Sequence, residues 1–169
     1  MLRPLREAGP ALLVPLAWLV VALADRGLLS ARSIFIAHLV MAAFIVFFLV
    51  TGWSAMETGA LAGWRAVVAT GLVVTLAGIG GFLWPAVSTP LWTTSLLGWM
   101  LLPIPGFGYT AWLLDDGAWV YAASAVVTAL GVAVWLAALA GGGETLTLAG
   151  LALVGLGHTV GIVDAVVRF

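Results

Sequence analysis

Charged side chains are nearly absent from this sequence, and this feature constrains the fold more than any other. Asp, Glu, Lys and Arg together make up 8% of the chain, while 64% of the residues are hydrophobic. A soluble domain carries about a quarter charged residues. Because so few charges cannot cover a surface that faces water, lipid must be the main solvent of the folded chain. We therefore predict an all-α, polytopic integral membrane protein.

Apolar runs separated by charged, Gly or Pro breaks predict a bundle of six transmembrane helices, which form one transmembrane domain over residues 1–169. Each span needs ~20 apolar residues. The runs are continuously apolar and lack the period-two alternation of a membrane β-barrel. We expect the helices at Ala11–Ala24, Ile34–Gly52, Ala66–Ala86, Leu91–Leu114, Ala118–Ala140 and Leu146–Val163.

The distribution of Arg predicts the orientation in the membrane. All six basic residues are Arg, and the side that holds both termini has four of them: Arg3, Arg6, Arg65 and Arg168. Since cytoplasmic loops carry the excess of basic residues, we expect both termini in the cytoplasm. Arg without Lys is typical of a GC-rich prokaryotic genome, so we expect a multi-pass protein of a prokaryotic plasma membrane.

The first apolar run also has features of a cleavable signal peptide. Arg3 and Arg6 precede a short apolar stretch that ends in Ala22-Leu23-Ala24, a small-residue cleavage pattern. A signal-anchor helix that stays in the protein is the alternative. We favour the anchor, because a polytopic protein needs no cleaved signal.

Tryptophan is abundant, with nine residues in the chain. Six of them lie near predicted helix ends, where an indole ring stays in the apolar layer and its N–H stays hydrated. We expect these six to form a membrane-interface belt. Trp18, Trp99 and Trp135 lie deeper, and each needs a partner for its N–H. The belt residues are Trp53, Trp64, Trp84, Trp92, Trp112 and Trp119.

The fourth predicted helix carries two prolines and two glycines in its second half. Proline removes a backbone donor and disfavours helix in the residue before it, so we expect a kink or break between Leu102 and Gly108. Broken membrane helices often line substrate or ion sites; the alternative is a plain proline kink. The substrate-path candidates on this helix are Thr93, Thr94, Ser95, Pro103, Pro105 and Gly106.

His38 and His158 are the two histidines, and both fall inside predicted spans. An ionisable group at membrane depth is a functional hypothesis by default. Two imidazoles from separate helices could hold a haem b between them, which would predict an electron-transfer or sensing protein. The alternative is that each imidazole makes a hydrogen bond across a helix interface. We expect both rings to point into the bundle from neighbouring helices.

Small residues surround His158. Gly157 and Gly161 form a GxxxG pattern, which is typical of close helix packing, and Gly155 and Gly161 lie on the same helix face as His158. We expect all three glycines to face protein or a ligand. Asp164 and Arg168 are four residues apart, so they can pair on one helix face.

The missing residue types exclude several functions. The chain has no Cys, which excludes disulfides, thiolate metal sites and Cys nucleophiles, and no Lys, which excludes Schiff-base chemistry. A net charge of -1 gives no basic surface for nucleic acid. No catalytic or metal-binding motif is present, so we assign no catalytic residue and no metal site and do not expect an enzyme. The sequence favours a transport protein of permease or channel type, or an accessory membrane subunit, with the bilayer and a second copy or a membrane partner subunit around it.

Overall fold

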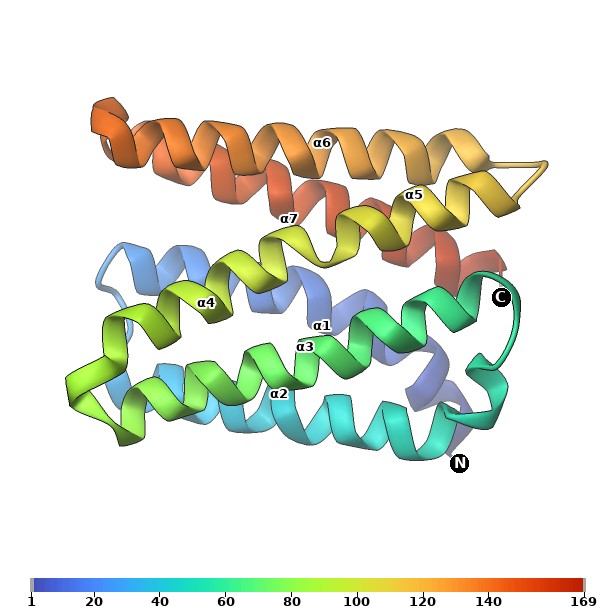
Figure 1. Cartoon of the computed structure of the whole chain (residues 1–169), viewed down its shortest axis with the longest axis horizontal. Coiled ribbons are helices and arrows are strands. Elements are labelled where there is room, and N and C mark those ends of the chain that lie inside the picture. The colour runs from blue at the N-terminus through green and yellow to red at the C-terminus, as the bar shows by residue number, and fades with distance from the viewer. Residues whose placement is uncertain (1, 169) are drawn as a thin grey trace.

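The computed structural model describes residues 2–168, and within them every regular element is a helix (Figure 1). Continuous apolar sequence dictates this result, because a helix satisfies its backbone polar groups internally and needs no water. Short 3-10 turns at Ser54–Met56 and Pro85–Val87 and a π-helical turn at Ala138–Gly142 join the main elements. The main helices are α1 (Leu2–Asp25), α2 (Ala31–Gly52), α3 (Gly59–Leu83), α4 (Ser88–Leu101), α5 (Pro103–Leu113), α6 (Ala118–Ala137) and α7 (Gly143–Arg168).

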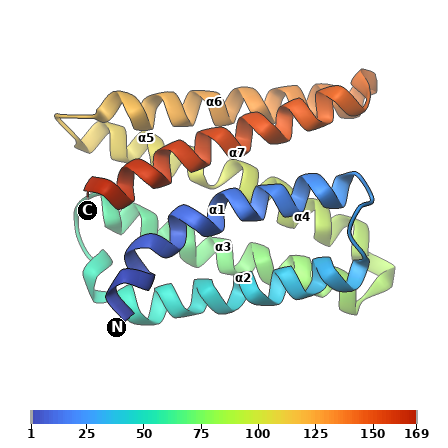
Figure 2. The same ribbon diagram turned by 180° about the vertical axis from the view of Figure 1, so that it is seen from behind.

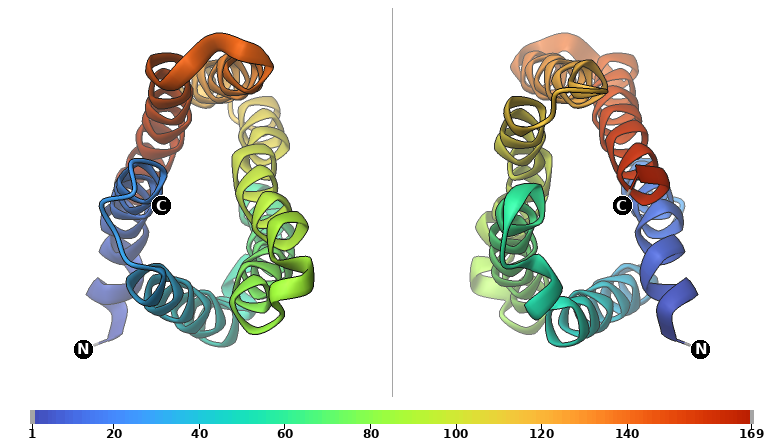
Figure 3. Two further views of the ribbon diagram at one scale, coloured as in Figure 1. Left: turned by 90° about the vertical axis from the view of Figure 1, so that its left-hand side faces the viewer. Right: turned by 90° about the vertical axis from the view of Figure 1, so that its right-hand side faces the viewer.

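The helices run side by side and form a ring when the bundle is viewed from its ends (Figure 3). Each helix packs on the next around this ring: α2 on α3, α3 on α4 and α5, α5 on α6, and α6 on α7. The ring closes where α1 packs along α7, while α1 and α2 touch only slightly (Figure 2). Helix α1 begins and α7 ends at the same end of the bundle (Figure 1). We call this end the terminal end.

Five helical stretches are long and apolar enough to cross a membrane: Ala31–Gly52, Gly59–Leu83, Pro85–Leu113, Ala118–Gly141 and Gly143–Arg168. The remaining expected segment, Ala11–Ala24, lies in α1, whose apolar part Gly9–Asp25 is shorter than these spans. Large exposed hydrophobic side chains occur on every helix from α1 to α7. The folded chain is therefore an all-helical protein with five helical stretches that have the length and apolarity of membrane spans.

Helix α3 begins seven residues earlier than the sequence indicated, at Gly59 instead of Ala66. Arg65 does not interrupt the helix, because its guanidinium lies 4.8 Å from the ring centroid of Trp53 at the terminal end. This cation–π contact lets the charge stay at the end of the bundle while the backbone continues as helix.

The fourth expected helix consists of α4 and α5, which meet at Leu102. Leu102 has helical φ/ψ angles of −56° and −40°, and its amide donates to the Gly98 carbonyl at 2.8 Å. Pro103 occupies the first position of α5, where a missing N–H removes no helical hydrogen bond. Pro105 and Gly106 lie within α5. The two helices follow one another along one rod (Figure 1).

Tryptophan side chains are exposed at both ends of the bundle, as an interface belt requires. The exposed members are Trp53, Trp84, Trp92, Trp112 and Trp119. Trp64, which we expected in the same belt, instead donates its Nε1–H inside the bundle to Thr110 Oγ1 at 3.0 Å. The reason is the early start of α3, which places Trp64 one turn inside the helix.

One arrangement of Trp, Thr and Gly recurs inside the bundle. Thr75 donates to the Gly71 carbonyl at 2.8 Å and accepts from Trp99 Nε1 at 2.9 Å. Thr110 likewise donates to the Gly106 carbonyl at 2.8 Å and accepts from Trp64. Each hydroxyl is therefore satisfied twice, and each pair joins two neighbouring helices.

Candidate functional site

His158 is the more deeply buried of the two histidines, with 4% of its surface exposed. Its Nδ1 accepts a hydrogen bond of 3.0 Å from Trp18 Nε1 on α1, and the two ring centroids lie 5.3 Å apart. The ring of Phe107 on α5 lies 5.9 Å away. His158 thus joins three helices of the ring, and the prediction that it points into the bundle is confirmed.

Glycines make room for these rings. A Cβ at Gly155 would lie 3.1 Å from Trp18 Cβ, and a Cβ at Gly161 would collide with Phe107. A Cβ at Gly157 would collide with Thr128 Oγ1 and lie 2.8 Å from the Ser124 carbonyl oxygen. The prediction that Gly155, Gly157 and Gly161 face protein is therefore confirmed.

The hydrogen bond from Trp18 fixes the tautomer of His158. An indole N–H only donates, so Nδ1 must present its lone pair. The neutral imidazole then carries its proton on Nε2, and this N–H has no partner among the described residues. A buried donor without a partner costs free energy. The Nε2–H of His158 is therefore free to donate to an acceptor that reaches it.

Three hydroxyl groups on α6 share this property. Tyr121, Ser124 and Thr128 are 0%, 2% and 0% exposed, and their hydroxyl oxygens lack hydrogen-bond partners among the described residues. Their spacing of three and four residues places them on one face of α6. Contacts at Gly157 show that this face lies against α7. We call Tyr121, Ser124, Thr128 and His158 the polar track.

The polar track reaches the charged surface at the terminal end. The Tyr121 hydroxyl lies beside the Asp164 carboxylate, which is a possible acceptor for it, and near Arg168, although its geometry does not complete a hydrogen bond. Arg168 Nε donates to Asp164 Oδ2 at 2.6 Å, and the Arg168 guanidinium lies 4.0 Å from Asp116. The pair predicted from the spacing of Asp164 and Arg168 is confirmed, and it lies at the mouth of the track.

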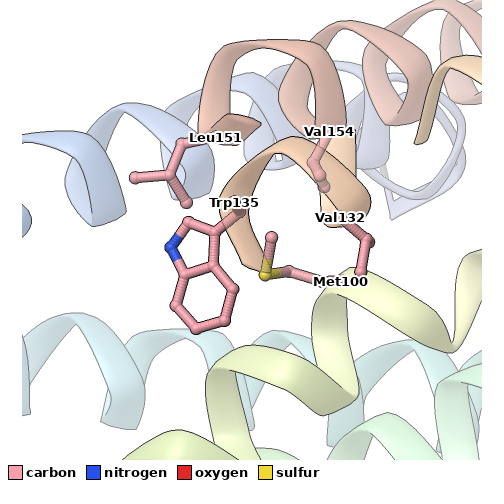
Figure 4. Close-up of a cluster of buried hydrophobic side chains, with 5 residues drawn as sticks. All are labelled: Met100, Val132, Trp135, Leu151 and Val154. Atoms are coloured by element: carbon pink, nitrogen blue, oxygen red, sulfur yellow. The ribbon is translucent and has the colours of Figure 1, made fainter. Parts of the chain in front are cut away.

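A hydrophobic cluster closes the other half of the bundle. Met100 from α4 packs with side chains of α6 and α7, and none of the five is more than 7% exposed (Figure 4). Trp18, Leu96 and Leu97 pack around this cluster. The polar track thus lies close to charged groups at one end and meets an apolar plug toward the other. The plug consists of Met100, Val132, Trp135, Leu151 and Val154.

His38 lies in a different part of the ring. Its Nδ1 lies 2.9 Å from the Ile34 carbonyl oxygen, which can only accept, so this nitrogen carries the proton. Its Nε2 and Ser95 Oγ both lie 2.6 Å from the position that a Cβ at Gly78 would take. His38 therefore packs against α3 and α4, and it shares no contact residue with His158.

The structure does not bring the two imidazoles into one site. Helices α2 and α7 are not a packed pair: α2 packs mainly on α3, whereas α7 packs on α6 and α1. Ligation of iron by His158 Nε2 would require its proton to leave and the Trp18 bond to rearrange. This arrangement does not favour a haem held by His38 and His158.

The candidates on the fourth expected helix do not form one site either. Thr93, Thr94 and Pro105 are exposed, while Ser95, Pro103 and Gly106 are buried. Pro105 and Gly106 line a groove of about 280 Å³ between α3 and α5, together with Thr70, Tyr109 and small or apolar residues. Ser95 contacts the His38 region instead.

Sequence reasoning missed Tyr121, Ser124 and Thr128. The available signal was the spacing of three and four between hydroxyl residues in an otherwise apolar helix that precedes a glycine-rich one. No family model, curated protein or solved structure matches the chain. The candidate function therefore depends on the geometry of the polar track.

Proposed function

We propose that the chain is a small membrane protein of permease or channel type, whose path for small hydrogen-bonding species includes the polar track. The observation that carries this proposal is the row of four buried polar atoms without partners inside an apolar bundle. Each unpaired group costs about 1–3 kcal/mol. Such a cost at membrane depth is typical of groups that serve a function.

The topology of this proposal is six spans with both termini in the cytoplasm. We assign the sixth span to α1, because it packs on α7 and begins at the terminal end (Figure 2). In this proposal the bend or break expected between Leu102 and Gly108 lies at the junction of α4 and α5. The excess of Arg at the terminal end supports the cytoplasmic orientation.

The path has a polar half and a gated half. From the terminal end, Tyr121, Ser124 and Thr128 offer donors and acceptors at successive turns of α6, and His158 offers a donor beside them. Beyond His158 the plug around Met100 excludes water (Figure 4). Hydrophobic constrictions close pores by dewetting, so the plug acts as the gate.

Flux into liposomes tests the proposal. The purified full chain is reconstituted, and the fluxes of water, glycerol, urea, protons and K⁺ are compared with those of protein-free liposomes. We expect at least one neutral species to cross faster with protein present, and faster again with Met100→Ala, which opens the plug. Met41→Ala, which changes a half-buried Met of α2 outside the plug, is the matched control.

Two outcomes contradict the proposal. If no species crosses faster than in protein-free liposomes, the chain is not a permease or channel, and the accessory-subunit hypothesis takes its place. If Met100→Ala and Met41→Ala change the flux equally, the path does not pass the plug.

A further inference from the structure

The polar track offers no charged side chain to a molecule inside the bundle. Its groups are three hydroxyls and one neutral imidazole, and the nearest charges, Asp164 and Arg168, lie at the mouth and pair with each other. An ion that left water for this track would lose its hydration without a compensating charge. An uncharged molecule with both donors and acceptors matches the groups that are present.

The contact between α6 and α7 limits the size of that molecule. Thr128 Oγ1 and the Ser124 carbonyl occupy the space beside Gly157, so the two helices nearly touch there. Axial separations along α6 are ~4.5 Å from Tyr121 to Ser124 and ~6 Å from Ser124 to Thr128. A path between these groups therefore admits only a molecule of about the size of water, which makes hydrogen bonds of ~2.8 Å, and it requires that α6 and α7 separate to let the molecule pass.

The hydrogen bond from Trp18 determines whether His158 can transfer a proton along the polar track. An imidazole relays a proton only when one ring nitrogen accepts while the other releases. The lone pair of His158 Nδ1 is engaged by the Trp18 N–H at 3.0 Å. While this bond persists, His158 can donate a hydrogen bond to a passing molecule but cannot take up a proton on its free side.

We infer that the polar track selects uncharged molecules of about the size of water, and that Trp18 prevents proton transfer at His158 through its hydrogen bond to Nδ1. This inference depends on the proposed function, because it names the species that the path admits. It adds a specificity-determining residue, Trp18, which lies on a different helix from the track.

The experiment compares two tryptophan variants in liposomes. Osmotic water flux is measured by stopped-flow light scattering, and proton flux by entrapped pyranine after a pH step with the membrane potential clamped. Trp18→Phe keeps an aromatic ring at this position but removes the indole N–H, so His158 Nδ1 loses its hydrogen-bond donor. We expect its proton flux to rise about tenfold, the factor that the free energy of one hydrogen bond represents, while water flux stays close to wild type.

Trp99→Phe is the matched control, because it also removes an interior indole hydrogen bond, to Thr75 Oγ1 at 2.9 Å, but not one to an imidazole. We expect it to leave proton flux unchanged. If wild-type protein passes water and Trp18→Phe does not raise proton flux above Trp99→Phe, the inference is wrong while the proposed function stands. If the wild type passes no neutral species, both fail.

A second measurement uses the wild-type protein and needs no variant. The chain contains only two histidines, so ¹⁵N spectra of histidine-labelled wild-type protein resolve both rings. We expect the tautomer of His158 with the proton on Nε2 alone. A signal from a proton on Nδ1 of both rings would overturn the assignment and the inference with it.

Discussion

The imidazoles of His38 and His158 are held as opposite tautomers. His38 carries its proton on Nδ1, facing the Ile34 carbonyl, whereas His158 carries its proton on Nε2 because Trp18 donates to its Nδ1. The free nitrogen is therefore an acceptor in His38 and a donor in His158. The two imidazoles therefore offer opposite hydrogen-bonding groups, and they do so in different parts of the bundle.

From this relationship we expect the purified protein to lack a bis-histidine haem spectrum. Haem ligation needs a lone pair on each coordinating nitrogen, and the His158 Nε2 carries a proton. Difference spectra after reduction with dithionite, with and without added haemin, provide the measurement. A Soret shift that is lost in both His38→Phe and His158→Phe would contradict this expectation.

Helix packing at Gly131 predicts a large effect of one methyl group. A Cβ at Gly131 would lie 2.7 Å from the Val154 backbone nitrogen and 2.8 Å from the Gly150 carbonyl oxygen. Backbone atoms cannot move aside as side chains do, so Gly131→Ala should destabilise the protein by about 1–3 kcal/mol. Thermal unfolding in detergent measures the difference.

Gly108 on α5 is the matched control for Gly131, because a Cβ there meets nothing within 4 Å. Gly108→Ala should leave stability unchanged or raise it by up to about 1 kcal/mol, the helix propensity of Ala over Gly. Equal melting temperatures for the two Ala variants would show that α6 and α7 do not touch at Gly131.

The double role of Thr75 predicts a stability loss without a change in size. Thr75→Val keeps the side-chain volume but leaves the Trp99 N–H without an acceptor, so we expect about 1–3 kcal/mol of destabilisation. Combining it with Trp99→Phe should restore part of this loss, because the unpaired donor is then removed as well. Additive losses in the double variant would contradict the hydrogen bond.

The orientation is tested by single cysteines in the natural Cys-free background. Ala55 and Asp116 are exposed in turns at the terminal end, while Leu28 is exposed at the opposite end. An impermeant maleimide added to intact cells should label Leu28→Cys but not Ala55→Cys or Asp116→Cys. The reverse pattern would place both termini outside.

The sequence predicted local features well where their cause was local. The glycines around His158 indicated close packing because each lies on a face fixed by helical periodicity. Asp164 and Arg168 paired because they are four residues apart. Trp18 was expected to need a partner, but the identity of that partner required the packing of α1 on α7.

The order of helices around the ring could not be predicted from sequence. His38 and His158 both face inward toward other helices, yet nothing in the sequence says that α1 separates α2 from α7. The track on α6 was missed for another reason. Ser and Thr in membrane helices commonly bond to their own carbonyls, and only the packed structure reveals that Ser124 and Thr128 do not.

The closure of the ring by α1 and α7 has a consequence for biosynthesis. Helix α1 is made well before α7, yet α7 is its main packing partner, and it touches its immediate neighbour α2 only slightly. Until α7 has been synthesised, the face of α1 that carries Trp18 has no helix to pack against. The hydrogen bond between Trp18 and His158 therefore forms only after α7 has entered the membrane, which places the burial of His158 late in assembly.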